Sequence, residues 1–205
     1  MRSFAIVPAA GQGRRLGGDK LLLACRGSTI LGCHLRAWTS SNVSTVVVVL
    51  RRSDQRAQAI AAAAGVEIVC PEKDPCDMKM SVQIGLRHIE LEHSPLEDDV
   101  WMLAPADMPR LAASDVNGVL TAHDPQQPTI IVPEFEQQAG HPVLFPWTVR
   151  QQVFQLGDEE GIDRLVRQSP SRRVVVSNQG CVEDIDTQQE YQQLLSGEPD
   201  RTPGP

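Results

Sequence analysis

The stretch that decides the fold is SFAIVPAAGQGRRLGGDKLLL, residues 3–23, near the start of the chain. It begins with an uninterrupted apolar run, 3–8, which is typical of a strand buried on both faces of a parallel sheet. Four glycines, two adjacent arginines and a lysine follow before the sequence turns apolar again. The N–H groups of a glycine-rich turn after a first parallel strand suit phosphate oxygens. The stretch therefore predicts a strand followed by a phosphate-binding loop.

Short apolar runs alternate with helical patterns through the rest of the chain. The runs predict further strands at 44–50, 66–70, 99–105 and 128–133, and the spacing between them predicts helices at 29–41, 54–64, 78–93 and 112–124. Later segments indicate strands at 141–146 and 172–177 and helices at 146–156, 161–168 and 187–195. This alternation predicts an α/β fold with three layers, α/β/α. Its twisted sheet is mostly parallel and binds ligands at the carboxyl ends of its strands.

Length and composition indicate an ordinary globular protein of 205 residues. We expect one domain over 1–195 and a disordered tail over 196–205, which is rich in glycine and proline. No apolar run approaches the roughly 20 residues of a membrane span, and the first residues do not resemble a secretory signal, so a cytoplasmic location is expected. The five cysteines are scattered and predict reduced thiols. A net charge of −7 argues against general nucleic-acid binding.

The glycine-rich loop admits more than one interpretation. A plain strand-to-helix turn is the simplest. A dinucleotide-binding fold is suggested by Gly11 and Gly13 after a strand, with Arg51 and Arg52 after the second strand, but a leucine occupies the place of the third glycine. The P-loop pattern is absent. Three cations between residues 14 and 20 favour a larger negative charge, such as a triphosphate with its leaving pyrophosphate.

The segment VPAAGQGRRLGGDKLLL resembles the signature A-A-G-x-x-x-R-x-G-x-x-K of the MobA- and MocA-like NTP transferases. These nucleotidyltransferases have a glycosyltransferase-A-like, Rossmann-type domain, and they wrap this loop around the triphosphate of an NTP. The resemblance implies that Arg15 and Lys20 are catalytic cations. It also implies a set of nucleotide-binding residues in the loop: Ala9, Ala10, Gly11, Gln12, Gly13 and Arg14.

The segment VWMLAPADMPRL places Asp107 just after a predicted strand. A carboxylate at a strand end that faces a phosphate loop suits Mg²⁺, which bridges protein and substrate oxygens. The alternative is an aspartate that caps the next turn. In the resembled family a D-x-P element supplies a metal-binding aspartate, so the resemblance implies that Asp107 binds Mg²⁺, contacts the nucleotide and takes part in catalysis.

The segment CVEDIDTQQEY is predicted to end a strand with Asp184 and Asp186 on the same face. Capping of the last helix by Asp186 and Thr187 is the alternative. The segment resembles D-I-D-T-P-E-D-Y of molybdenum cofactor cytidylyltransferases, although two glutamines replace Pro-Glu. This resemblance implies a metal-binding role for Asp186 and an acceptor-binding role for Asp184, and it leaves open which of the two reaches the metal.

Three more segments resemble the same branch of the family. DMKMSVQIGL matches M-S-x-S-x-x-x-G-L, which implies that Ser81 lies near the base and ribose. AGHPVLF and LGDEEGIDRLV resemble segments on the acceptor side, which implies acceptor-binding roles for Gly140, His141, Gly157 and Asp158. The remaining histidines are interpreted as structural or solvent-facing: His34, His88, His93 and His123.

Taken together, the resemblance implies Mg²⁺-dependent transfer of CMP from CTP to a phosphorylated acceptor with release of pyrophosphate. The cytidylyl branch carries Ala-Ala-Gly, whereas guanylyltransferases typically carry Gly-Gly after one alanine, so CTP is expected. The expected acceptor is molybdopterin, with a molybdoenzyme-maturation protein as a partner. Alternatives are a guanylyltransferase, a transferase to a sugar phosphate or to methylerythritol phosphate, a non-catalytic nucleotide-binding protein and an NADP-dependent dehydrogenase. The oligomeric state is left open between monomer and dimer.

Overall fold

The computed structural model describes residues 1–11 and 19–196. Its main sheet has the order β10-β7-β9-β6-β1-β4-β5, with the short β8 (Gln138–Ala139) paired to β7. The strands are β1 (Ser3–Pro8), β4 (Thr45–Val49), β5 (Glu67–Val69), β6 (Val100–Leu103), β7 (Ile130–Phe135), β9 (Val143–Pro146) and β10 (Ser171–Val175). On the main path β9 alone runs antiparallel to its neighbours β6 and β7. The predicted mostly parallel sheet is therefore confirmed.

The strand order reverses at β1, which pairs in parallel with β4 on one side and β6 on the other. At such a switch point the loops after neighbouring strands diverge and leave a crevice. The loop after β1 begins with Ala9, and the loop after β6 contains Asp107. Two of the segments for which a ligand role was predicted thus leave the sheet at the same crevice.

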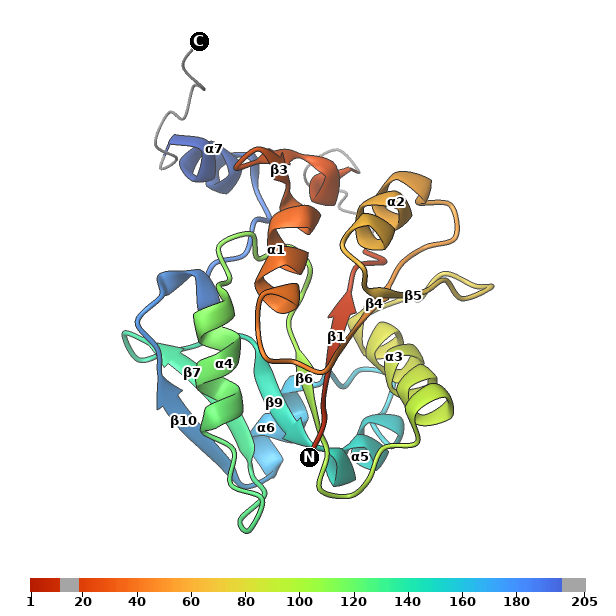
Figure 1. Ribbon diagram of the computed structural model, residues 1–205, viewed down its shortest axis with the longest axis vertical. Coiled ribbons are helices and arrows are strands. Elements are labelled where there is room, and N and C mark those ends of the chain that lie inside the picture. The colour runs from red at the N-terminus through yellow and green to blue at the C-terminus, as the bar shows by residue number, and fades with distance from the viewer. Residues whose placement is uncertain (12–18, 197–205) are drawn as a thin grey trace.

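Helices cover both faces of the sheet and complete the predicted three layers (Figure 1). Ala5 and Val7 of β1 pack in one core cluster with side chains of α1 (Ile30–Thr39), α2 (Gln55–Ala63) and α4 (Ala113–Thr121). Phe4 and Ile6 pack in another cluster with α3 (Met78–His93), α5 (Arg150–Phe154) and α6 (Asp163–Gln168). This alternation follows from the period of two along a strand. None of the described helices could span a membrane.

The last described helix docks beside a small hairpin that the sequence analysis did not predict. Its strands β2 (Ala24–Cys25) and β3 (Ser28–Thr29) are joined by Arg26 and Gly27, both with positive φ (47° and 71°), as tight primed turns require. Helix α7 (Gln188–Ser196) lies beside this hairpin (Figure 1), and Tyr191 donates a hydrogen bond to the Ala24 carbonyl. This docking brings the segment before α7 to the crevice at the carboxyl ends of β1 and β6.

One predicted element is wrong: residues 181–186 form no strand. A 3-10 turn, Gln179–Cys181, is followed by irregular backbone. The segment forms isolated backbone hydrogen bonds in place of a strand pairing. One of them runs from the Ile185 N–H to the Asp107 carbonyl oxygen (3.0 Å). Ile185 itself is buried in a cluster with the hairpin. Asp184 and Asp186 therefore flank a buried side chain without belonging to a strand.

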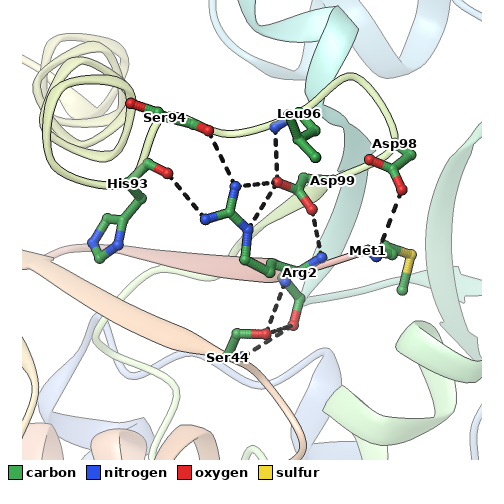
Figure 2. A network of polar contacts seen from close by, with 9 residues as sticks. Met1, Arg2, Ser44, His93, Ser94, Leu96, Asp98 and Asp99 are labelled. Atoms are coloured by element: carbon green, nitrogen blue, oxygen red, sulfur yellow. Dashed lines mark hydrogen bonds and ion pairs between the residues drawn. The ribbon is translucent and has the colours of Figure 1, made fainter.

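A polar network ties the amino end of β1 to the loop before β6 (Figure 2). The buried Asp99 accepts hydrogen bonds from the Arg2 backbone N–H, the Arg2 guanidinium and the Leu96 N–H. The same guanidinium donates to the carbonyls of His93 and Ser94 at the end of α3. Burial alone would raise the pKa of Asp99, but these hydrogen bonds outweigh it and hold the pKa below its ordinary value. This network lies at the amino ends of β1 and β6, whereas the crevice lies at their carboxyl ends.

Candidate active site

A cavity of about 780 Å³ lies at the carboxyl ends of β1, β4 and β6. Its wall is built from the loops that follow these strands, from the turn that begins at Asp19, from the segment before α3 and from the segment before α7. The lining residues include Pro8, Ala9, Ala10, Gly11, Lys20, Arg51, Asp54, Asp77, Ser81, Ala106, Asp107 and Asp186. The position and size suit a nucleotide-sized ligand.

Lys20 joins two carboxylates in this cavity. Its Nζ lies 2.7 Å from Asp107 Oδ2 and 2.7 Å from Asp186 Oδ1. The Lys20 side chain is only 12% exposed, and burial alone would lower its pKa. The two neighbouring carboxylates outweigh burial and raise the pKa of Lys20 above its ordinary value. The ammonium group is therefore charged at neutral pH.

The two aspartates fit a divalent cation. Asp107 Oδ1 is buried and has no hydrogen-bond partner among the described residues, while Oδ2 is held by Lys20. Mg²⁺ commonly binds through one or two carboxylates together with substrate phosphates, and Asp107 and Asp186 supply such a pair. In residues 1–11 and 19–196 no cluster of three or more His, Cys, Asp or Glu side chains suits a metal. The donor set therefore fits a metal that arrives with phosphate oxygens better than a fully protein-held ion.

The backbone of the loop after β1 continues this strand into the cavity. Ala9 donates its N–H to the Val49 carbonyl, and Ala106 donates to the Pro8 carbonyl. A Cβ at Gly11 would meet no atom within 4 Å in the described part of the chain, so protein packing does not require glycine there. Of the residues predicted for this loop, Gln12, Gly13, Arg14 and Arg15 lie outside the described residues.

Ser81 lines the cavity from the first turn of α3. It is buried, and its hydroxyl donates to the Asp77 carbonyl at 3.2 Å. Asp77 caps the helix by accepting from the Met80 N–H. Gly85, one turn further on, allows α3 to lie close to β1, because a Cβ there would sit 2.8 Å from Ile6 Cγ2. Ser81 thus brings the first turn of α3 to the cavity, and Gly85 allows the helix to pack closely on β1.

The residues predicted to bind the acceptor do not belong to this wall in the described part of the structure. His141 Nδ1 lies 3.2 Å from the Leu103 carbonyl oxygen. Burial lowers the pKa of His141. Gly140 packs against the Cys181 carbonyl, where a Cβ would be 2.4 Å away. The carbonyls of Gly157 and Asp158 both accept from Lys79.

Asp184 lines a separate cavity of about 200 Å³ together with Arg110 and Glu183. Burial, followed by the nearby charges of Asp107 and Asp186, raises the pKa of Asp184. Asp184 thus lies close enough to feel the charges of Asp107 and Asp186, although it lines a distinct cavity. The acceptor roles of these five residues remain predictions.

Sequence analysis missed Arg51 and Asp54 as parts of the cavity wall. Arg51 Nη2 lies 2.9 Å from Asp54 Oδ2, and both follow β4. The sequence analysis considered Arg51 only as a cation for a dinucleotide. Its position directly after a predicted parallel strand was the signal that could have placed it at this edge.

Comparisons with known proteins identify a family and a fold. Residues 5–174 match the family model described as MobA-like NTP transferase domain. Among curated proteins, the purine catabolism protein PucB of Bacillus subtilis (strain 168) is 28% identical over 194 residues, which cover 89% of this chain and 91% of PucB.

Solved structures show the same fold. The crystal structure of Rv0371c from Mycobacterium tuberculosis H37Rv is 26% identical and superposes with a TM-score of 0.82, covering 97% of this chain and all of that chain (100%). The Rv0371c complex with manganese is 24% identical with a TM-score of 0.79, over 97% of this chain and 100% of that chain. The chain thus has a fold that is already known from crystal structures.

Proposed function

The chain belongs to the MobA-like NTP transferase family and is a nucleotidyltransferase, and on this premise we propose that it transfers CMP from CTP to the terminal phosphate of molybdopterin. The observation that supports this most is the bridge from Lys20 to Asp107 and Asp186 in the cavity at the strand switch point. It brings together a cation for phosphate and a carboxylate pair for Mg²⁺.

In the proposed reaction an acceptor phosphate oxygen attacks the α-phosphorus of CTP. A new P–O bond forms, and the bond to the β-phosphate breaks, so pyrophosphate leaves with the electron pair. The acceptor phosphate is already ionised at neutral pH, so the protein need not remove a proton. Catalysis then depends on positioning and on neutralising charge.

Asp107 and Asp186 would hold Mg²⁺, which when bound neutralises phosphate charge and polarises the phosphoryl oxygens. Asp107 offers its Oδ1, which has no hydrogen-bond partner among the described residues, and hydrogen bonds of Ala106 and of the Asp107 carbonyl hold the backbone around it. Support for a divalent cation also comes from Rv0371c, which has been crystallised with manganese.

Lys20 would move its ammonium group from the two carboxylates to the β- and γ-phosphates. Its raised pKa keeps it charged, and its low exposure strengthens its interaction with phosphate. A contact of this kind that strengthens as the pyrophosphate leaves can lower the barrier by about 2–4 kcal/mol. The buried residues Ala9 and Ala10 hold the turn that faces the nucleotide.

The choice of CTP rests on Ala9-Ala10-Gly11, and the choice of molybdopterin rests on the GHPVLF and DIDT segments. A thermal-shift screen of CTP, GTP, UTP, ATP and NADPH, each with and without Mg²⁺, tests the nucleotide. We expect the largest Mg²⁺-dependent rise in Tm with CTP. A larger rise with GTP would reassign the protein as a guanylyltransferase, and a rise with NADPH alone would contradict the transferase proposal.

A further inference from the structure

His34 is a fully buried imidazole behind the cavity, and the mechanism above does not use it. It lies in α1, is 0% exposed, and is not part of the described cavity wall. Its Nδ1 lies 3.2 Å from the carbonyl oxygen of Met108, the residue that follows Asp107. The indole Nε1 of Trp38, one helical turn further on, donates to His34 Nε2 at 2.9 Å.

The Trp38 contact determines which nitrogen of His34 bears the hydrogen. An indole N–H can only donate, so Nε2 must accept with its lone pair. The hydrogen of the neutral ring then lies on Nδ1, where it donates to the Met108 carbonyl. Burial lowers the pKa of His34 to about 4, so the ring is neutral at pH 7. The His34 ring thus accepts from Trp38 at Nε2 and donates to the Met108 carbonyl at Nδ1.

The hydrogen bond from His34 completes the set of contacts that hold the backbone around Asp107. Ahead of Asp107, the Ala106 N–H bonds to the Pro8 carbonyl at 3.3 Å. The Asp107 carbonyl accepts from Ile185 at 3.0 Å, and the Met108 side chain is 2% exposed. Three consecutive residues, 106–108, are therefore each tied by one backbone group to a different segment: β1, the chain before α7, and α1.

We propose that His34 is a positioning residue for the metal-binding carboxylate: its Nδ1–H holds the Met108 carbonyl and thereby aims Asp107 into the cavity. This inference rests on the proposed function, because it assigns a role toward the metal that Asp107 would bind. Groups that orient a metal ligand typically change metal affinity or activity by about 10–100-fold when they are removed.

Two substitutions separate this role from simple core packing. In His34→Asn the amide nitrogen can replace Nδ1–H and still donate to Met108, while the acceptor for Trp38 is lost. In His34→Gln the amide oxygen can replace Nε2 and still accept from Trp38, while the donor to Met108 is lost. Each variant loses one buried hydrogen bond and some packing volume, so we expect similar falls in Tm.

The readout is binding of Mn²⁺ to the full chain in the presence of CTP, followed by electron paramagnetic resonance. We expect His34→Gln to weaken Mn²⁺ binding about 10-fold or more, and His34→Asn to stay within about 3-fold of the unsubstituted protein. The same order should appear in kcat, with little change in the KM for CTP at saturating metal. Equal Mn²⁺ affinities for the two variants would overturn the inference.

The unsubstituted protein distinguishes failure of the inference from failure of the proposed function. Absence of Mn²⁺ binding to the unsubstituted chain with every nucleotide would contradict the proposed function itself. If neither variant folds, long-range ¹H–¹⁵N NMR of the histidine rings decides the question on the native chain. A hydrogen on Nδ1 of His34 supports the positioning role, and a hydrogen on Nε2 overturns it.

Discussion

Lys20 and Asp186 are separated by 166 residues of sequence, yet their side chains meet at 2.7 Å in the cavity. The contact depends on two pieces of structure at opposite ends of the chain: the turn that leads into the β2–β3 hairpin and the segment that precedes α7. Asp107, in the loop after β6, contacts the same ammonium group. One lysine thus contacts both carboxylates that would hold a metal.

Replacing Lys20 by methionine should have opposite effects on two measurements. Without the ammonium group, Asp107 and Asp186 repel each other, and a divalent cation relieves that repulsion. We therefore expect Lys20→Met to bind Mn²⁺ more tightly than the unsubstituted protein when no nucleotide is present. Turnover with CTP should fall by about 10²–10³-fold, since a phosphate contact is lost. Titration calorimetry with Mn²⁺ and a pyrophosphate-release assay measure the two effects.

The exposed Lys73 provides the control for that experiment. Lys73→Met removes the same charge from a side chain that, among the described residues, forms no ion pair with Asp107 or Asp186, and it should leave both quantities nearly unchanged. Weaker Mn²⁺ binding by Lys20→Met without nucleotide would show that Lys20 does not compete with the metal.

Asp107→Asn should abolish turnover while the fold survives. The amide retains the size of the carboxylate but loses the charge that binds the cation, so we expect a loss of about 10³-fold or more in kcat with a small change in Tm. Asp98→Asn, an exposed aspartate at the far edge of the sheet, is the matched control. Normal pyrophosphate release by Asp107→Asn would remove Asp107 from the metal site.

Two helical glycines should respond in opposite ways to alanine. In Gly85→Ala the new Cβ would lie 2.8 Å from Ile6 in the core, so we expect a loss of about 1–3 kcal/mol in the free energy of unfolding. In Gly118→Ala the Cβ meets no described atom within 4 Å, and the better helix propensity should add about 0.5–1 kcal/mol. Urea unfolding measures both, and equal effects would contradict the close approach of α3 to β1.

The network around Asp99 predicts how the free energy of unfolding depends on pH. The pKa of Asp99 is lower in the folded protein than its ordinary value of 3.8. Its contribution is therefore fully present above that ordinary value and is lost as the pH falls through the lower folded pKa. At pH 7, Asp99→Asn should lower the free energy of unfolding by about 1.5–3 kcal/mol.

The difference between Asp99→Asn and the unsubstituted protein should shrink as the pH falls below about 4. Urea unfolding at several pH values follows this difference. A difference that stays constant with pH would show that the carboxylate charge does not stabilise β1. Because the network lies far from the cavity, the variant should retain its kcat under conditions where it is folded.

The sheet could be predicted because its strands are buried on both faces. The run VVVV at 46–49 and the run VWML at 100–103 are apolar without a break, and both lie in strands where the sequence placed them. The hairpin at 24–29 could not be found this way, since each of its strands has only two residues and its turn lacks an Asn-Gly pair.

The candidate site was predictable only in part. Lys20, Asp107 and Asp186 were singled out by resemblance, and the structure brings their side chains together. His34 was interpreted as structural or solvent-facing, because the sequence offers it no partner at ligand spacing. In the structure its partners are a backbone carbonyl and an indole on its own helix. Contacts of that kind leave no spacing pattern in a sequence.

Transfer of label from [α-³²P]CTP to molybdopterin, with simultaneous measurement of released pyrophosphate, tests the central claim most directly. With Mg²⁺ present, we expect labelled product and pyrophosphate in equal amounts, and neither with Asp107→Asn. Label that is transferred from [α-³²P]GTP in preference to CTP, or release of orthophosphate in place of pyrophosphate, would contradict the proposed cytidylyl transfer.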